Sequence, residues 1–247
     1  MQRRAFLGLS LCGAINAVAN TQQQDNALWI KDDQTAVFLS VVQKIELVKR
    51  AVGHGNFNIL SFDAMLQTAK RYRKIGAFDA RELAFMEERF YEDPQKYGFF
   101  GAKTVANLTD VINIKETIKL DASGQYLFGG ISYRSYERVI TDVGNSLELT
   151  SGIRSVAKQM NLYFNKIKST GGNITQAVHS IAPPAYSYHS IGDFDVGKKG
   201  WGHKNFTVSF AATKEFWRLR QLSYIQMRYT INNEDGVRFE PWHVKII

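Results

Sequence analysis

The sequence Tyr-Ser-Tyr-His-Ser-Ile-Gly-Asp-Phe-Asp-Val-Gly at residues 186–197, completed by Glu-Pro-Trp-His at residues 240–243, contains the side chains of a candidate metal centre. The two stretches offer two histidines, two aspartates and a glutamate. A catalytic zinc needs three protein ligands of these types and an open position for water. A third stretch, Ser-Gly-Ile-Arg-Ser at residues 151–155, adds a cation. We therefore interpret the C-terminal part of the chain as built around a metal.

The spacing of the candidate ligands favours this interpretation. His189 and Asp195 are six residues apart, an even separation, so on an extended chain both side chains point to the same side. Gly192 lies between them and permits the bend that would bring them close. His243 would supply the third ligand from the last part of the chain. Such a set leaves one coordination position open, where water becomes a nucleophile near neutral pH.

Glu240 and Arg154 are the candidate catalytic residues beside this metal. Glu240 stands three residues before His243 and is not needed as a ligand, so it could take a proton from the attacking water and deliver it to a leaving amine. Arg154 keeps its charge and could hold a substrate carbonyl or carboxylate as negative charge builds up. Each residue alone is more often structural, and it is their joint occurrence that indicates catalysis.

Composition places the chain among ordinary globular proteins. It has 247 residues, of which 45% are hydrophobic and 13% aromatic, enough for one large domain or two small ones. The formal charge of +8 favours an anionic partner. Lys and Arg are spread along the chain, without zinc-finger spacing or another nucleic-acid-binding motif, so we expect no nucleic-acid partner.

The first 19 residues have the order of an export signal. Arg3 and Arg4 are followed by an apolar run over 6–14 and by Ala-Val-Ala at 17–19. The double arginine also resembles a twin-arginine signal. The apolar run is too short to span a membrane. We therefore expect a protein exported to the periplasm or cell envelope, with no stable membrane span in the mature chain.

The single cysteine, Cys12, lies inside that signal. The mature chain would then have no thiol, which excludes disulfides, thiolate ligands and a cysteine nucleophile. Leu11 is bulkier than the small residue expected before a lipidated cysteine, so we rank a lipoprotein signal low. Any metal site must use His, Asp and Glu.

Apolar periodicity predicts an α+β fold with a helical N-terminal part. Helices are expected over 37–52, after Ser61, and after Asp79, which forms a capping box with Glu82. The later elements are strands over 112–120, 125–129 and 147–152, helices over 132–143, 154–167 and 213–222, and a closing hairpin of 227–231 with 239–246. We divide the chain into a signal (1–19), a helical N-terminal region (20–112) and a catalytic domain (113–247).

The three stretches, in this order, resemble the zinc D-alanyl-D-alanine carboxypeptidases of the vancomycin-resistance type. The wider group includes D-Ala-D-Ala dipeptidases, lysostaphin-like endopeptidases and the hedgehog fold. The resemblance covers about residues 145–247 and implies a small antiparallel-sheet peptidase core that holds one Zn²⁺ per chain. The residues that match the family's functional positions are His189, Asp195 and His243 as zinc ligands, Glu240 as base, Arg154 as the substrate-orienting arginine, and Ser187 as a substrate contact. Tyr186 is expected to line the same substrate groove, although core packing explains it equally well.

One position departs from the family pattern. The family usually places its aspartate seven residues after the first histidine, where this chain has Val196. A deletion of one residue after Gly192 restores the match and makes Asp195 the ligand. Asp193 is the competing ligand, and we prefer Asp195 because Asp193 sits directly against the glycine bend.

The resemblance implies hydrolysis of the D-Ala–D-Ala bond in peptidoglycan stem peptides, with Glu240 as general base. Two alternatives stay open. An endopeptidase that cuts crosslinks would differ only in groove length and loop shape. A non-catalytic wall-binding module on the same fold would have no use for the Glu240 carboxylate beside an open zinc, so that residue favours the enzyme.

Overall fold

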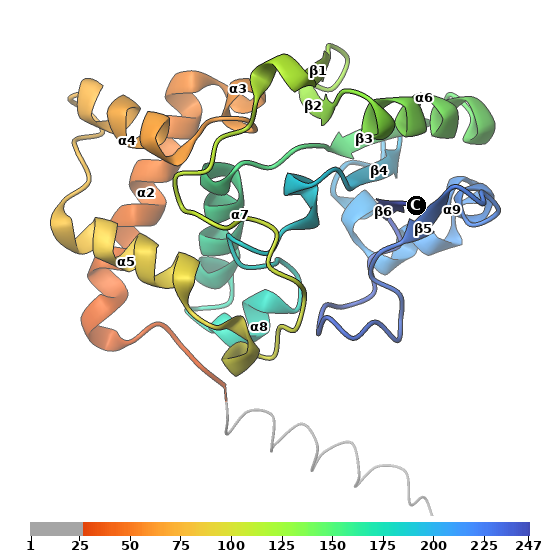
Figure 1. Cartoon of the computed structure of the whole chain (residues 1–247). Helices are drawn as coiled ribbons and strands as arrows, with labels where there is room; N and C mark the ends of the chain where they lie inside the picture. Colours follow the sequence, from red (N-terminus) through yellow and green to blue (C-terminus); the bar gives the residue numbers. More distant parts are fainter. Residues whose placement is uncertain (1–26) are drawn as a thin grey trace, which may run out of the picture.

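The computed structural model describes residues 27–247, which form a helical part and a part built on an antiparallel sheet (Figure 1). The expected export signal lies outside the described residues. The α-helices are α2 (Thr35–Val52), α3 (His54–Phe57), α4 (Phe62–Arg71), α5 (Ala80–Tyr91), α6 (Ile131–Val143), α7 (Val156–Ser169), α8 (Ile174–Val178) and α9 (Lys214–Leu219). The strands are β1 (Thr117–Leu120), β2 (Gln125–Phe128), β3 (Leu147–Ser151), β4 (Phe194–Lys198), β5 (Ile225–Met227) and β6 (His243–Ile246). Short 3-10 helices are η1 (Asp32–Gln34), η2 (Pro94–Tyr97), η3 (Ile114–Glu116), η4 (Tyr188–Ser190), η5 (Gly202–Phe206) and η6 (Val208–Ala212).

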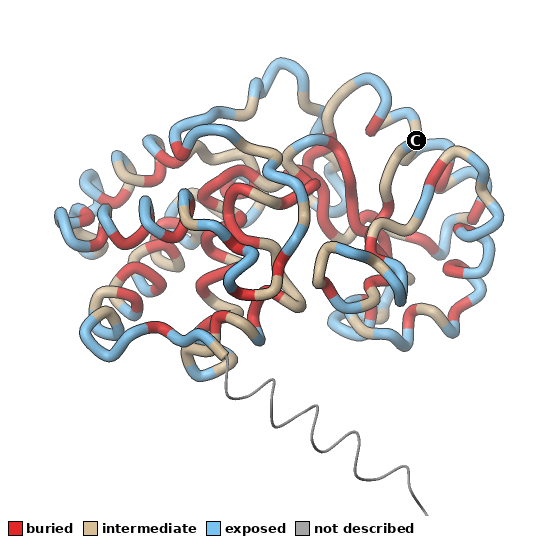
Figure 2. The backbone as a smooth tube through the Cα atoms, turned by 60° about the horizontal axis from the view of Figure 1, so that its bottom comes forward, coloured by how far each residue is buried: buried red, intermediate tan, exposed pale blue. Residues whose placement is uncertain are grey.

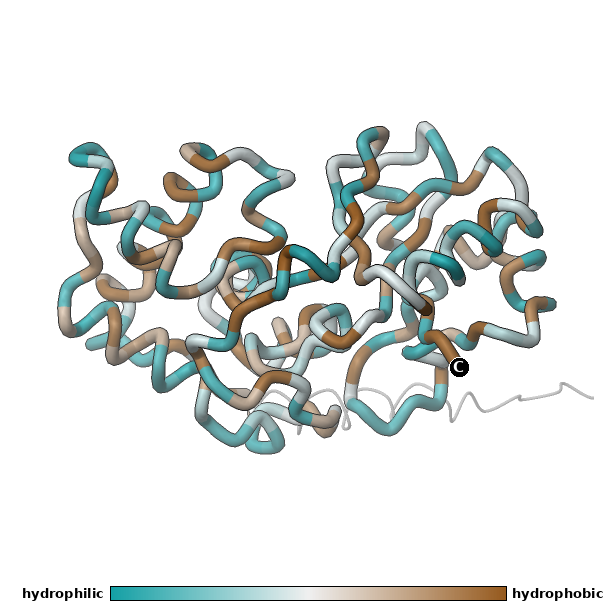
Figure 3. Tube along the Cα trace, turned by 45° about the horizontal axis from the view of Figure 1, so that its top comes forward, coloured by the Kyte–Doolittle hydropathy of each residue, from teal (hydrophilic) through white to brown (hydrophobic). Residues whose placement is uncertain are grey.

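The helices of the N-terminal part begin and end where their capping residues predict. The Ser61 side chain accepts a hydrogen bond from the Ala64 amide at the start of α4. Asp79 and Glu82 form the expected capping box of α5. Gly53, with φ of 85°, ends α2 in a conformation that other residues avoid. Hydrophobic and hydrophilic residues alternate along these helices, as amphipathic helices require (Figure 3).

The main hydrophobic core joins the N-terminal helices to α7 and α8. Phe38 of α2, Phe85 of α5 and Phe164 of α7 form a three-ring cluster with centroids 5.7 to 6.3 Å apart. Buried residues run through the centre of this part in Figure 2, and α7 lies beside the N-terminal helices in Figure 1. The predicted domain boundary at residue 112 stays a prediction, and this core is formed from residues on both sides of it.

A four-stranded antiparallel sheet in the order β3-β4-β6-β5 forms the second part. Its core is packed against α6 and α9, with Phe194 and Val196 of β4 fully buried at its centre. A separate hairpin pairs β1 with β2. Helices and antiparallel sheets in one chain confirm the predicted α+β class.

Several predicted elements differ in extent. The closing strand, expected over 239–246, is confined to His243–Ile246, and the helix expected over 213–222 ends at Leu219. Residues 114–116 are a 3-10 helix, because the Asn113 side chain accepts from the Lys115 amide and shortens the first strand to Thr117–Leu120. α7 begins at Val156, because Ser155 caps it and leaves Arg154 outside the helix. β5 covers 225–227, so the expected hairpin strand at 227–231 is wrong apart from Met227.

The closing hairpin exists but is not tight. β5 and β6 pair antiparallel, from Ile225 with Ile246 to Met227 with Val244. The connection between them is irregular, since Asn233 Nδ2 donates to the carbonyl oxygens of Thr230 and Val237 and folds the loop upon itself. This long connection carries Glu240 to the metal ligands. Among the described residues, no helix combines the length and the apolar character needed to cross a membrane.

Candidate metal centre

The structure brings His189, Asp195 and His243 together. His189 lies in η4, Asp195 in β4 and His243 at the first position of β6. Asp195 and His243 are direct partners in the β4–β6 register, which places their side chains together. One ligand atom from each of the three residues lies within 4.8 Å of the other two, and all three residues are buried.

The bend at Gly192 brings His189 to this position, as the sequence indicated. Gly192 has φ of 120°, and its carbonyl oxygen accepts a hydrogen bond of 3.1 Å from Ser132 Oγ. A Cβ at this position would lie 2.7 Å from Ser132 Oγ, so only glycine fits. The expectation that His189 and Asp195 face one side of an extended strand is wrong, because His189 lies in a 3-10 turn.

The converging atoms fit a metal ion. Asp195 Oδ1 lies 3.3 Å from His189 Nε2 and 3.4 Å from His243 Nδ1. Within residues 27–247, His189 Nε2 and Asp195 Oδ1 are buried without a hydrogen-bond partner. Such atoms are costly in a protein interior unless something else satisfies them. Two imidazoles and one carboxylate are a ligand set of catalytic zinc sites, and they leave a fourth position open.

Two of the side chains are electrostatically prepared to bind a cation. Burial, helped by the neighbouring Arg154 charge, lowers the pKa of His189 to about 4, so its ring is neutral at physiological pH. Burial alone would raise the pKa of Asp195, but the neighbouring His189 imidazole and the charge of Arg154 outweigh it and hold that pKa well below its usual range. Asp195 is therefore ionised and His189 can offer a lone pair.

The glutamate of the second stretch lies beside this cluster. Glu240 is buried, and its Oε2 atom is 3.8 Å from His243 Nδ1. Burial raises the pKa of Glu240. Burial lowers the pKa of His243, but its interactions with the Asp193 and Glu240 carboxylates outweigh that effect and raise the pKa to about 9. A cation bound at Nδ1 would take the place of a proton there.

Asp193, the competing ligand, lies outside the cluster. Its Oδ2 atom is 3.2 Å from His243 Nε2, on the opposite edge of that ring from Asp195. Both its oxygens also accept hydrogen bonds from Arg228. The structure thus groups Asp195 with the histidines and pairs Asp193 with an arginine.

Arg154 reaches the site from the segment that precedes α7. Its Nη2 atom donates to Asp195 Oδ2 at 2.5 Å, and its Nε atom donates to Ser151 Oγ at 3.0 Å. These two bonds tie the guanidinium to Asp195 and to Ser151. Arg154 also lines a cavity of about 140 Å³, together with Ser190 and Asp110.

Ser187 and Tyr186 are placed differently from each other. Ser187 is 3% exposed, and its Oγ atom has no hydrogen-bond partner within residues 27–247. This hydroxyl lies two residues before the candidate ligand His189. The Tyr186 ring packs edge-on against Phe99 at a centroid distance of 5.7 Å and joins the main core. The structure does not bring Tyr186 into the metal cluster.

The sequence reasoning missed the segment over residues 102–112, which lies against the site. Thr104 Oγ1 donates to the Ser187 carbonyl oxygen at 3.0 Å and accepts from Ser190 Oγ at 2.9 Å. The same segment supplies three apolar residues of the 140 Å³ cavity, Val105, Val111 and Ile112. Local sequence carries no signal for this contact, because it joins residues far apart in the chain.

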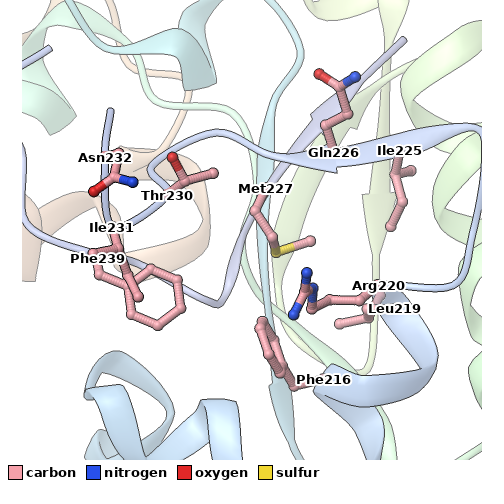
Figure 4. Close-up of a pocket in the computed structure, with 10 residues that line it drawn as sticks. All are labelled: Phe216, Leu219, Arg220, Ile225, Gln226, Met227, Thr230, Ile231, Asn232 and Phe239. Atoms are coloured by element: carbon pink, nitrogen blue, oxygen red, sulfur yellow. The ribbon is translucent and has the colours of Figure 1, made fainter. Parts of the chain in front are cut away.

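A second cavity, of about 490 Å³, lies beside β5 (Figure 4). The residues that line it come from α9 and its end, from β5 and from the loop that follows, and they include Phe216, Met227 and Phe239. None of the three candidate ligands lines it, so it is not the metal site.

Comparison with known protein families finds a match for the C-terminal half of the chain. Residues 128–247 match the family model described as VanY, D-alanyl-D-alanine carboxypeptidase. A search of curated proteins finds no match.

Several solved structures resemble the chain, among them the following three. The structure of the LdcB LD-carboxypeptidase is 22% identical, with a TM-score of 0.43 over 49% of this chain and 59% of that one. VanYB in complex with D-Ala-D-Ala is 21% identical, with a TM-score of 0.39 over 53% of this chain and 77% of that one. A mutant of the vancomycin-resistance D,D-pentapeptidase VanY in complex with Zn(II), from a VanB-type resistance cassette, is 19% identical, with a TM-score of 0.39 over 58% of this chain and 85% of that one. The chain thus spans 59% of the first of these proteins.

The matched region contains every residue of the candidate metal centre, from Arg154 to His243. The family match confirms the resemblance seen in the sequence, and the three candidate ligands form a group that could hold a metal ion. Residues 128–247 of this chain thus match the VanY family of D-alanyl-D-alanine carboxypeptidases.

Proposed function

We propose that this protein is a D,D-carboxypeptidase that removes the terminal D-alanine from peptidoglycan stem peptides. The observation that carries the proposal is the convergence of His189, Asp195 and His243, with two ligand atoms left without hydrogen-bond partners within residues 27–247 and Glu240 alongside. The family of residues 128–247 gives the bond class. The family's activity is extended here to the whole chain, which includes a helical region that the family model does not cover.

His189, Asp195 and His243 would hold the zinc ion. Bound there, zinc would polarise a peptide carbonyl and lower the pKa of water. His189 donates Nδ1–H to the Gly152 carbonyl oxygen at 2.8 Å, so its Nε2 atom is free to bind the metal. Asp195 supplies Oδ1, since its Oδ2 atom is occupied by Arg154.

Glu240 is the proposed general base and acid. Its carboxylate lies 3.8 Å from the ligand atom of His243, within reach of a water that attacks a substrate beside the metal. It takes the proton of that water and then delivers it to the departing amine of D-alanine. The carboxylate is buried, which keeps bulk water from competing for the proton.

Arg154 and Ser187 are the proposed substrate-binding residues. Arg154 Nη1 can donate to the oxygen on which negative charge develops, and its pairing with Asp195 fixes the guanidinium in place. Ser187 Oγ is buried and, within the described residues, free to bond a polar group of the peptide. The cavity that Arg154 and Ser190 line leaves room for a small side chain or a carboxylate.

The test is a digest followed by mass spectrometry. The purified zinc-loaded protein is incubated with muropeptides that end in D-Ala–D-Ala, beside Glu240→Ala and Glu240→Gln. We expect the wild type to release one alanine and both variants to lose at least about 100-fold in rate. The zinc content of the variants is measured as the control, because a base that is not a ligand can be replaced without loss of metal.

The other outcomes assign a different function. Cleavage of crosslinked dimers without release of a terminal alanine would identify an endopeptidase. Release of the D-Ala–D-Ala dipeptide would identify a dipeptidase. Zinc binding without any product would identify a wall-binding module and overturn the catalytic proposal.

Export to the cell envelope is proposed on the sequence of residues 1–19 alone. A peptidase for wall peptides has its substrate outside the cytoplasm, which agrees with such a signal. Fractionation of cells that express the full chain, beside a variant with Arg3 and Arg4 replaced by Lys, tests it. Equal amounts of wild type and variant in the cytoplasm would contradict twin-arginine export.

A further inference from the structure

We infer that Asp193, held by Arg228, positions the His243 ring so that it binds the metal through Nδ1. The inference rests on the proposed metal centre and assigns roles to two residues that do not contact the metal. It explains why a second aspartate stands so close to the ligand Asp195, and it gives Arg228 a part in the site.

The His243 ring lies between two carboxylates. Asp195 Oδ1 is 3.4 Å from its Nδ1 atom, and Asp193 Oδ2 is 3.2 Å from its Nε2 atom. A neutral imidazole carries one N–H, and the acceptor on one nitrogen decides which of the two has the lone pair. With Nε2–H donated to Asp193, the lone pair of Nδ1 faces Asp195 and the metal position.

His189 uses the opposite arrangement. Its Nδ1 atom is bonded to the Gly152 carbonyl oxygen at 2.8 Å, and its Nε2 atom faces Asp195 at 3.3 Å. The two histidines therefore present different nitrogens to the same point, and each needs its own acceptor on the outer side. The acceptor for His189 is the Gly152 carbonyl oxygen, whereas the acceptor for His243 is the Asp193 carboxylate.

Arg228 fixes the orientation of Asp193. Its Nε atom donates to Asp193 Oδ2 at 2.7 Å, and its Nη2 atom donates to Oδ1 at 3.1 Å, a two-point contact that allows one orientation of the carboxylate. The guanidinium also lies over the Tyr188 ring, with Cζ 3.8 Å from the centroid. The Arg228 guanidinium and the Asp193 carboxylate are thus both packed against other protein groups.

The backbone ties the same residues together. The Asp193 amide donates to the Tyr188 carbonyl oxygen at 3.2 Å, and the Arg228 amide donates to the His243 carbonyl oxygen at 3.1 Å. Asp193 is 5% exposed, so its charge depends on Arg228 for compensation. The bend that carries the ligand His189 therefore also carries the support for His243.

The test measures zinc affinity rather than activity. Zinc dissociation constants are obtained by competition with a chromophoric chelator for the wild type, Asp193→Ala, Asp193→Asn, Arg228→Lys and Arg228→Gln. We expect Asp193→Ala to weaken zinc binding about 10- to 100-fold. Asp193→Asn should lose less, because the amide oxygen still accepts from Nε2, and Arg228→Lys should lose less than Arg228→Gln, because it keeps the charge.

Two controls separate positioning from folding. Asp142→Asn changes an exposed carboxylate that also lies near an arginine, Arg138, and it should leave zinc affinity within about twofold. The unfolding free energy of each zinc-free variant is measured by urea titration. A purely structural role lowers that free energy but leaves the zinc affinity of the folded protein unchanged. The absorption spectrum of the cobalt-substituted protein should also shift in the Asp193 variants, because the His243 ring moves.

Three results would overturn the inference. Folded Asp193→Ala or Asp193→Asn that binds zinc as tightly as the wild type would show that the carboxylate does not position the ring. Loss of zinc by Asp193→Ala as complete as that of Asp195→Ala would make Asp193 itself a ligand. A wild type that binds no zinc would overturn the metal centre and this inference together, whereas a zinc-loaded, active wild type with unaffected variants would overturn this inference alone. If Asp193→Ala does not fold, the zinc affinities of Asp193→Asn and Arg228→Lys decide whether the carboxylate positions the ring.

Discussion

At the scale of single residues, the site depends on polar groups that the fold leaves without partners. His189 Nε2, Asp195 Oδ1 and Ser187 Oγ are all buried and free within the described part of the chain. The first two are explained by a metal ion. A metal ion does not explain the Ser187 hydroxyl. Substitution of Ser187 therefore tests whether a peptide binds at this hydroxyl.

We predict that Ser187→Ala raises KM without lowering stability. Within residues 27–247 the hydroxyl makes no protein hydrogen bond that its loss could break, so the unfolding free energy should change by less than about 0.5 kcal/mol. A lost hydrogen bond to substrate should raise KM about 3- to 10-fold. Steady-state kinetics on a D-Ala–D-Ala peptide and urea titration measure the two effects. Ser169→Ala, on the exposed end of α7, is the matched control. An unchanged KM would remove Ser187 from the binding site.

A second residue-scale prediction concerns Lys158, in the first turn of α7. Burial, followed by repulsion from Arg154 and Lys49, lowers its pKa from 10.5 to about 8. The folded state therefore binds this proton more weakly than the unfolded state. Below pH 8 the lysine is charged in both states, and the folded state bears the full cost. Above pH 10.5 it is neutral in both, and the cost disappears.

We expect the contribution of Lys158 to stability to improve as pH rises from about 8 to 10.5. Lys158→Met, which keeps the length of the side chain, should stabilise the zinc-free protein at about pH 7 and lose this advantage above pH 10.5. Urea titrations of both proteins across this range measure the difference. A difference that is constant with pH would show that the lysine has its ordinary pKa in the folded protein.

At the scale of elements, the segment over residues 102–112 joins the helical part to the site. The Thr104 amide and hydroxyl bond to the Ala185 carbonyl oxygen, and the hydroxyl also bonds to Ser187 and Ser190. Ala102 donates its amide to Tyr188 Oη at 3.1 Å. The turn that carries His189 is therefore held from outside by a segment that the family model does not cover.

We predict that Thr104→Val destabilises the protein by about 1–3 kcal/mol. Valine has nearly the same shape, but it removes the three hydrogen bonds that the Thr104 hydroxyl makes with the Ser190 hydroxyl and with two carbonyl oxygens. Thr141→Val removes an exposed hydroxyl that bonds only within α6, and it should cost less than about 0.5 kcal/mol. Thermal unfolding with and without zinc measures both. Equal effects of the two substitutions would mean that the segment does not brace the site.

At the scale of the whole molecule, the metal centre lies where two hydrophobic cores meet. The turn that bears His189 packs against the main core through Tyr188, and Asp195 and His243 lie in the sheet between the residues of the second core. The main core includes α7 and α8 as well as the N-terminal helices (Figures 1 and 2). A fragment that lacks those helices would expose the apolar face of α7.

We therefore predict that residues 113–247 do not form a stable domain alone. In this fragment α7 carries Tyr163, Phe164 and Ile167, which the whole protein buries in the core shared with the N-terminal helices. Without those helices this apolar surface would be exposed to water, at a free-energy cost of about 25 cal/mol per Å². Circular dichroism and limited proteolysis of the fragment, compared with residues 20–247, measure this. In the longer chain, Phe164→Ala should cost about 3–5 kcal/mol. A cooperatively unfolding fragment of 113–247 that binds zinc would establish the boundary at residue 112.

Much of this protein follows from its sequence alone. Local rules predict the caps at Ser61 and Asp79, because a capping side chain bonds to an amide two or three residues away. They also predict the bend at Gly192, because a positive φ needs glycine. The ligand types His189, Asp195 and His243 follow from the chemistry of zinc, and their order in the chain points to the family.

Only the tertiary structure decided how these groups are arranged. The sequence left Asp193 and Asp195 as alternatives, and the β4–β6 register separates them by pairing Asp195 with His243, while Arg228 occupies Asp193. The sequence also did not predict the contact of Thr104 with the site, or that α7 belongs to the core of the N-terminal helices. These are contacts between residues distant in sequence, and their energy comes from packing and from partners that a local pattern of residues does not specify.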